Sequence, residues 1–144
     1  MQSQERYSID AAAGTFEDRV FLGGNYIHGA LLKHMAEAVR DCRFTPIIVW
    51  EFGIQPGTER DSSYRLLEQC KLAIFEVSTD GGHIGELEQA VRYGTITLCV
   101  WDASTGGPRM TAIVQANPFF DLKKGYTSIR ELSYLVYDFL RSQN

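Results

Sequence analysis

Short apolar runs alternate with amphipathic helical segments along this chain, and this alternation limits the possible folds more than any other feature. Four runs of apolar and β-branched residues occupy positions 20–22, 47–50, 72–77 and 95–101. The last two are almost continuously apolar, which is typical of parallel strands that are covered on both faces. Between the runs, apolar residues recur every three or four positions, as on one face of a helix. The pattern predicts an α/β domain with a mainly parallel sheet.

The expected helices cover residues 27–39, 62–70, 84–94 and 127–140. We therefore predict a flavodoxin- or Rossmann-like three-layer sandwich, with a five-stranded sheet in the order 2-1-3-4-5. In such sheets, ligands bind beyond the carboxyl ends of the strands, where the strand order reverses. The loops that follow the first and third apolar runs are therefore the expected places for a site.

Length and composition limit the classes of function. The 144 residues predict one domain over residues 19–144, after a weakly ordered leader at 1–18. The formal net charge of −4 leaves no basic surplus for nucleic acid. The apolar runs are too short to span a membrane, and the N-terminus has no signal-peptide pattern. Cysteines at three apolar positions indicate reduced thiols in a cytoplasmic protein: Cys42, Cys70 and Cys99.

The first loop begins with Gly23-Gly24-Asn25-Tyr26 and leads from a predicted strand into a predicted helix. Backbone N–H groups at such a helix start can receive an anion or the edge of a sugar. The alternative is a tight turn that binds nothing. The GxGxxG and GxxxxGK[ST] spacings are both absent from this loop, so no dinucleotide or other cofactor is predicted.

The second loop ends at Glu86, which falls in the first turn of a predicted helix. A helix N-terminus favours an ionised carboxylate, so Glu86 is either a nucleophile or a simple complement to the helix dipole. Asp80 and His83 precede it, as an N-cap and a solvated loop residue in the simplest interpretation. The other histidines, His28 and His34, do not have a metal-ligand spacing with His83, and no metal site is predicted.

Three segments resemble the nucleoside 2-deoxyribosyltransferase superfamily, which includes nucleotide N-glycosidases. Residues 20–26, VFLGGNY, resemble its opening strand and loop. Residues 67–90 resemble its strand, loop and GxxxELGxA segment, in which Glu86 holds the place of the family's nucleophile. Residues 110–114 resemble its SAMI segment, where Thr111 takes the place of a hydroxyl residue that reaches a phosphate bound by the neighbouring subunit. The resemblance therefore implies a homodimer or a multiple of one.

The activity that the resemblance implies is cleavage or transfer of the N-glycosidic bond of a nucleoside or nucleotide. Such reactions pass through an oxocarbenium-like transition state, which a carboxylate beneath the sugar stabilises. Glu86 would carry the reaction, with Asp61 assisting departure of the base and Tyr26 ordering Glu86 or flanking the base. The remaining residues expected to contact substrate are Gly23, Gly24, Asn25, Ser63, Asp80, Gly82, His83 and Thr111.

Two other interpretations stay open at this point. A TIR-like, NAD-cleaving domain would share the sheet and the Glu at the start of the helix. A non-catalytic nucleotide-binding signalling module is favoured by Ser63, which stands where the hydrolases of the superfamily have an Asp.

Overall fold

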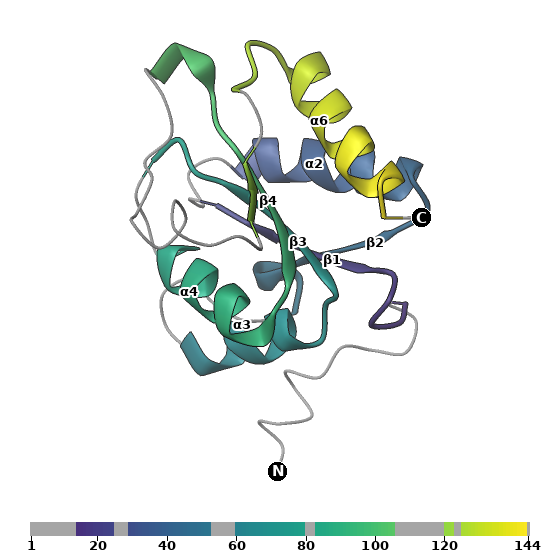
Figure 1. Ribbon diagram of the computed structural model, residues 1–144, viewed down its shortest axis with the longest axis vertical. Helices are drawn as coiled ribbons and strands as arrows, with labels where there is room; N and C mark the ends of the chain where they lie inside the picture. The colour runs from purple at the N-terminus through teal and green to yellow at the C-terminus, as the bar shows by residue number, and fades with distance from the viewer. Residues whose placement is uncertain are drawn as a thin grey trace.

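The molecule is a parallel sheet that lies between two layers of helices, as the ribbon of the computed structural model shows (Figure 1). The structure describes the backbone of residues 14–24, 29–52, 60–79, 83–105, 120–122 and 125–143. It describes the side chains of the same residues except 60–62, 83, 84 and 120–122.

The sheet has the strand order β2-β1-β3-β4-β5, and every neighbouring pair is parallel. The predicted α/β fold with a parallel sheet is confirmed, and the four apolar runs correspond to β1 to β4. β5 has only three residues, and no apolar run in the sequence predicted its position. The strands are β1 Arg19–Gly23, β2 Thr45–Ile48, β3 Leu72–Glu76, β4 Ile96–Val100 and β5 Phe120–Leu122.

β2 begins two residues earlier than the apolar run at 47–50 predicts, and it includes Pro46. Proline lacks a backbone N–H, so it is tolerated mainly in strands at the edge of a sheet. β2 is the first strand in the sheet order and therefore has one unpaired side in the described sheet. Val49 and Trp50 belong instead to the short 3-10 helix η3, Val49–Phe52.

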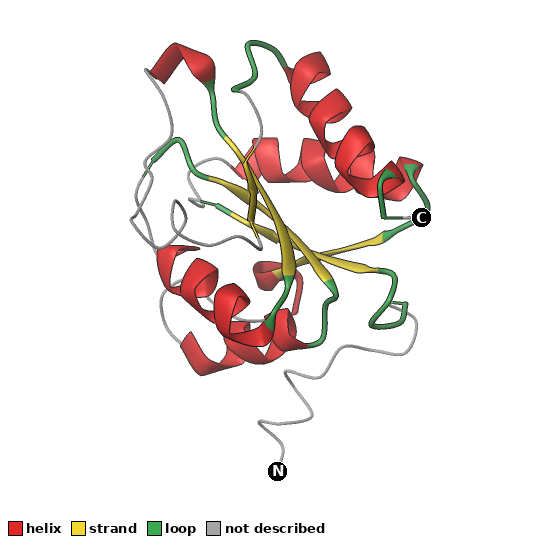
Figure 2. Ribbon diagram, viewed as in Figure 1, coloured by secondary structure: helices red, strands yellow, loops and turns green. Residues whose placement is uncertain are grey.

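In the described part of the chain, two helices cover each face of the sheet (Figure 2). α2 and α6 pack on one face, and α3 and α4 pack on the other. All four helices lie within two residues of the predicted ranges. They are α2 Gly29–Asp41, α3 Arg60–Glu68, α4 His83–Tyr93 and α6 Ile129–Arg141, with the short 3-10 helix η4 at Ala103–Thr105.

The sheet separates two hydrophobic cores. In β1, Val20 and Leu22 join the core under α2 and α6, whereas Phe21 joins the core under α3 and α4. β3 divides in the same way, with Ile74 on the first side and Phe75 on the second. Because successive residues of a strand point to opposite faces, a continuously apolar run supplies both cores.

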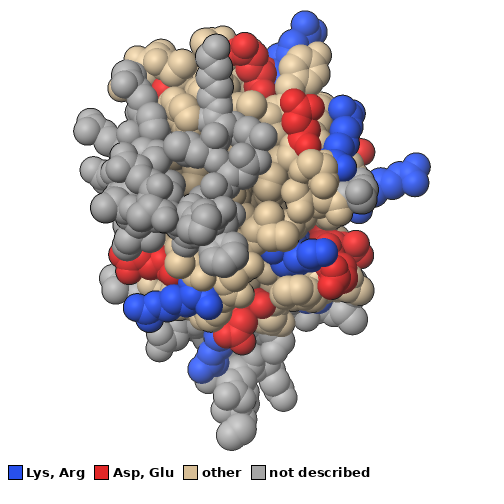
Figure 3. All heavy atoms as spheres, in the orientation of Figure 1, with Lys and Arg blue, Asp and Glu red and all other residues tan. Residues whose placement is uncertain are grey.

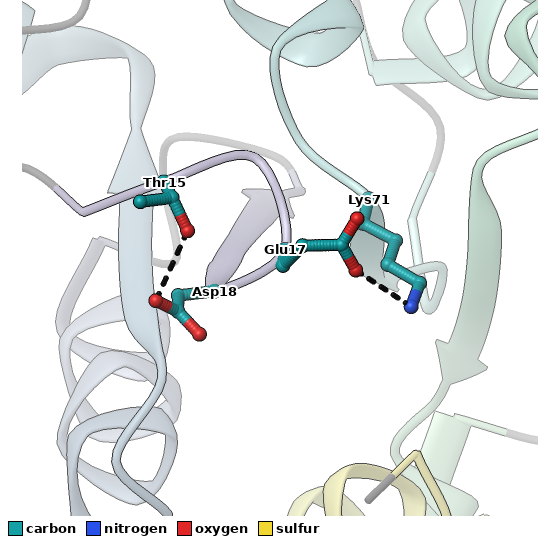
Figure 4. A network of polar contacts seen from close by, with 4 residues as sticks. All are labelled: Thr15, Glu17, Asp18 and Lys71. Carbon is teal, nitrogen blue, oxygen red and sulfur yellow. Dashed lines mark hydrogen bonds and ion pairs between the residues drawn. The ribbon is translucent and has the colours of Figure 1, made fainter.

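The predicted leader reaches into the described chain only at residues 14–18, and residues 1–13 lie outside it. Residues 15–18 form a turn, in which the backbone N–H groups of Asp18 and Arg19 both donate to the carbonyl oxygen of Thr15. Lys71 Nζ lies 2.9 Å from Glu17 Oε2, and the Thr15 hydroxyl donates to Asp18 (Figure 4). Glu17 and Lys71 are both exposed, so this pair contributes at most about 1 kcal/mol.

Acidic and basic side chains are interspersed over the described part of the face drawn in Figure 3. None of the helices in the described ranges combines the length and the apolar character that a membrane span requires.

The start of α6 is stabilised by its own polar residues. Ser128 is the N-cap, and its hydroxyl accepts a hydrogen bond from the backbone N–H of Glu131 at 3.1 Å. The Glu131 carboxylate reaches back and accepts from the backbone N–H of Thr127 at 2.7 Å and from the Thr127 hydroxyl. This reciprocal arrangement resembles a capping box that is displaced by one residue.

We expect Ser128→Ala to lower the free energy of unfolding by about 1 kcal/mol, because it removes the acceptor for a helix N–H group. Urea denaturation measures the change. Ser133→Ala is the matched control, since Ser133 lies inside the same helix, where alanine is the better helix former. Equal losses in the two variants would contradict a capping role for Ser128.

Candidate functional site

The strand order reverses between β1 and β3. The chain leaves β1 toward β2 on one side, and it returns to β3 on the other side. At such a point, the two connections diverge and leave a crevice beyond the carboxyl ends of the strands. In this protein the crevice is bordered by Gly23 and Gly24 at the end of β1 and by Glu76 to Ser78 at the end of β3. Residues on both faces of the sheet reach this edge.

On the face covered by α3 and α4, Glu86 and Ser63 form a buried polar pair. Glu86 lies in the first turn of α4, and Ser63 of α3 is hydrogen-bonded to its side chain. Each residue is only 6% exposed. Burial raises the pKa of Glu86 to about 7, although the hydrogen bond with Ser63 lowers it. Desolvation therefore outweighs the favourable helix dipole, and Glu86 is only partly ionised near neutral pH.

Gly23 lies against this pair and is required by packing. A Cβ atom at Gly23 would come within 2.4 Å of the Phe75 ring and 3.5 Å of Glu86 Oε1. Phe75 is completely buried and cannot move aside without disturbing the core. The glycine at this position is thus explained by the close approach of β1 and Phe75.

We expect Gly23→Ala to destabilise the fold by about 1–3 kcal/mol, the usual cost of forcing an atom into a filled core. Gly29→Ala is the control, because its Cβ would meet only Trp50 at an ordinary distance of 3.8 Å. Denaturation midpoints of both variants check this expectation. A Gly23→Ala protein as stable as Gly29→Ala would refute the packing explanation.

The structure brings together three of the residues expected to form the site: Glu86, Ser63 and Gly23. Gly24 instead faces Leu32 and Glu76, since its Cβ would lie 3.4 Å from each. Asp61 and His83 lie in α3 and α4, but their side chains are outside the described residues. The other expected site residues also lie outside the described chain: Asn25, Tyr26, Asp80, Gly82 and Thr111.

On the face covered by α2 and α6, Glu76 is the centre of a network that the sequence patterns did not reveal. Glu76 is the last residue of β3 and is 3% exposed. Its Oε1 accepts from the backbone N–H of Ser78 at 2.6 Å. Its Oε2 accepts from the Ser78 hydroxyl at 2.8 Å and from the Tyr126 hydroxyl. The Ser78 hydroxyl in turn accepts from the backbone N–H of Asp102 at 2.7 Å.

Tyr126 connects the start of α6 to this network through hydrogen bonds. Its backbone N–H donates to Trp101 at 2.9 Å, and its carbonyl oxygen accepts from Ala103 at 2.8 Å. Burial and the contact with Glu76 raise the pKa of Tyr126 far above its usual range, so its hydroxyl stays protonated and remains a donor. The only sequence signal for this network is an acidic residue at the end of an apolar strand, because Tyr126 is 50 residues further along the chain.

A cavity of about 500 Å³ opens above the network, between the starts of α2 and α6. Its volume lies within the range of small-molecule sites. Six of the eleven described lining residues carry hydroxyl groups, and none of the eleven is Lys, Arg or His. The lining residues are Ala30, Leu31, Glu76, Ser78, Thr79, Asp102, Thr105, Tyr126, Thr127, Ser128 and Ile129.

Comparison with protein-family models gives no match, and comparison with curated protein sequences gives none either. Solved structures do share the fold. Two variants of a flavo di-iron protein from Thermotoga maritima superpose with TM-scores of 0.61 and 0.62 at 10% sequence identity. The match covers 93% of this chain but only 38% of those proteins. A flavoprotein from the same organism gives a TM-score of 0.58 with the same identity and coverage.

These findings correct the functional prediction. The resemblance to the nucleoside 2-deoxyribosyltransferase superfamily is wrong, because family models and curated sequences give no match and the solved structures named above are flavo di-iron proteins and a flavoprotein. The predicted activity is wrong for the same reason. It was cleavage or transfer of N-glycosidic bonds, as a hydrolase or transferase with Glu86 as nucleophile. The TIR-like NAD-cleaving domain and the non-catalytic nucleotide-binding signalling module have no support either.

The physical reason for the error is that the fold alone accounts for the matched motifs. Gly23 is fixed by its contact with Phe75. Acidic residues are frequent in the first turn of helices in unrelated proteins, and Glu86 occupies such a position. Short matches at these two positions therefore do not distinguish one α/β family from another.

Proposed function

We propose that this chain binds a flavin mononucleotide at the carboxyl edge of its sheet and serves in electron transfer. The observation that carries the proposal is the cavity of about 500 Å³ beside the point where the strand order reverses. Flavodoxin-like sheets of this order hold flavin mononucleotide at that point. The names of the flavo di-iron proteins that share the fold refer to a flavin, and this supports a ligand of the same class.

The start of α2 fits the phosphate of such a ligand. Helix N-termini receive anions through their free N–H groups and the positive end of the helix dipole. The first turn of α2 contains no acidic residue, and its Ala30 and Leu31 line the cavity. The start of α6 is less suited, because Ser128 and Glu131 already bond to its N–H groups and Glu131 adds a negative charge.

The residues of the chain would bind and orient the ligand, and the flavin when bound would supply the group that gains and loses electrons. Ala30, Leu31 and Ile129 provide apolar surface, and the hydroxyl-bearing residues provide donors and acceptors. Tyr126 holds the wall that α6 contributes in place. The homodimer and the cytoplasmic location expected from the sequence stay predictions.

Titration of the purified chain with flavin mononucleotide tests the proposal. We expect saturable quenching of flavin fluorescence with one site per chain, and a rise in melting temperature as the ligand stabilises the folded state. The bound flavin should be bleached by dithionite and should regain its absorption on reoxidation. Leu31→Glu places a negative charge in the first turn of α2 and should weaken binding at least tenfold.

The matched control is Lys33→Glu, which makes a charged substitution on the exposed side of the same helix. It should change binding less than threefold, since position 33 does not line the cavity. If the wild-type chain neither quenches the flavin nor gains thermal stability at about 100 µM ligand, the proposed function is refuted.

A further inference from the structure

We infer that Asp102 orients the ligand in this cavity, because it accepts hydrogen bonds from the uncharged, hydroxyl-bearing part of the ligand and its negative charge keeps the phosphate away. The inference rests on the proposed function and deepens it. For a flavin mononucleotide, the hydroxyl-bearing part is the ribityl chain. The phosphate then stays at the start of α2, outside the acidic part of the cavity.

The charge of the cavity wall supports this division. Glu76 and Asp102 are the only charged residues among those described around the cavity, and both are acidic. An anionic group placed between them would meet repulsion without a compensating cation. A hydroxyl group at the same place would be attracted, because carboxylates accept hydrogen bonds and form short, strong ones with O–H donors.

The two carboxylates differ in whether they have an oxygen left to accept a hydrogen bond from a ligand. Both oxygens of Glu76 already accept from Ser78 or Tyr126, and its side chain is buried. Asp102 is half-buried, and its Oδ1 accepts from the backbone N–H and hydroxyl of Ser104 at 2.9 and 2.7 Å. Within the described part of the chain, no donor bonds to its Oδ2. Asp102 is therefore the carboxylate that is able to take a donor from the ligand.

The position of Asp102 is also fixed from several sides, as a residue that orients a ligand requires. Its backbone N–H donates to Ser78, and its carbonyl oxygen accepts from the Thr105 hydroxyl at 2.7 Å. It forms an isolated parallel bridge with Tyr126. These bonds hold its carboxylate at the junction of β4 and α6, where the hydroxyl-bearing walls of the cavity meet.

The test compares flavin mononucleotide with riboflavin, which has the same ribityl chain and no phosphate. Asp102→Asn removes the charge and keeps the shape. We expect it to raise both dissociation constants by about tenfold, because a charge-assisted hydrogen bond is lost, and to leave their ratio unchanged within threefold. Fluorescence quenching measures both constants, and the melting temperature of each variant reports folding.

Ser104→Ala is the matched control, since it removes a neighbouring hydroxyl but keeps the Asp102 charge, and it should change both constants less than threefold. Thr79→Val gives a second measurement in case Asp102→Asn does not fold. It removes a hydroxyl from the cavity wall without changing side-chain shape, and should weaken both ligands equally, by about threefold.

Two results would overturn the inference while leaving the proposed function intact. One is a tighter binding of flavin mononucleotide alone in Asp102→Asn, which would place the phosphate against Asp102. The other is unchanged binding of both flavins in Asp102→Asn and Thr79→Val. Failure of the wild-type chain to bind either flavin would instead refute the proposed function, and the inference with it.

Discussion

Glu86→Gln is expected to stabilise the folded protein by about 3 kcal/mol at pH 8.5 and to change its stability little at pH 4. The pKa of Glu86 is raised from 4.5 to about 7 by burial. Each pKa unit corresponds to roughly 1.4 kcal/mol. The folded state thus holds a proton that the unfolded chain has released, and wild-type stability falls as the pH rises from about 4.5 to about 7.

Glutamine has nearly the same shape as glutamate, can still accept a hydrogen bond from Ser63, and carries no charge at any pH. The variant therefore avoids the cost of ionising a buried carboxyl above pH 7. Urea denaturation at pH 4 and pH 8.5 measures the two differences, and the melting temperature at pH 8.5 should rise by roughly 10 °C.

Glu88→Gln is the matched control for this result. Glu88 lies in the same helix, two residues further along, and its side chain is exposed. Its substitution should show no comparable dependence on pH. If Glu86→Gln gave the same stability difference at both pH values, the raised pKa of the buried Glu86 carboxyl would be disproved.

Phe75→Ala is expected to cost about 3–5 kcal/mol, since it empties the space of a large and fully buried ring. Phe75 also packs against Phe21, with the ring centroids 5.9 Å apart, so that contact is lost as well. Denaturation at a pH where the wild-type protein is stable measures the loss.

The Phe75→Ala variant also provides a background in which the cost of Gly23→Ala is expected to change. The added Cβ of Gly23→Ala lies 2.4 Å from the Phe75 ring only as long as that ring is present. In the Phe75→Ala background, Gly23→Ala should therefore cost almost nothing, and a double-mutant cycle should give a coupling of about 1–3 kcal/mol. Additive losses would show that Gly23 is needed for another reason.

The sequence predicted the elements of the fold because their signals are local. The apolar run from Leu72 to Val77 needs no knowledge of distant residues to be assigned to a buried strand, and the spacing from Ile129 to Leu140 similarly predicts α6. β5 was not located, since three residues are too few to establish an alternating pattern. The predicted position of β2 was two residues too late, because Pro46 is tolerated only in a strand at the edge of the sheet. The sequence does not show which strand lies at the edge.

The candidate site was predicted only in part, for a related reason. Glu86 and Gly23 were singled out from local motifs, and the structure does bring them together with Ser63. The cavity, in contrast, depends on Glu76 meeting Tyr126, a contact between residues 50 positions apart. No local pattern encodes such a meeting. The pKa of Glu86 likewise depends on burial by several elements, which one helix position does not disclose.

The attachment of α6 through Tyr126 has a consequence for the order in which the molecule becomes functional. One wall of the cavity is supplied by residues 126–129, which are synthesised after all the described strands of the sheet. A nascent chain that has already paired β1 to β4 would still have an open, solvent-filled edge. The cavity closes only when the last helix docks and the Tyr126 hydroxyl reaches Glu76. The proposed ligand site thus stays incomplete until α6 has docked on the sheet.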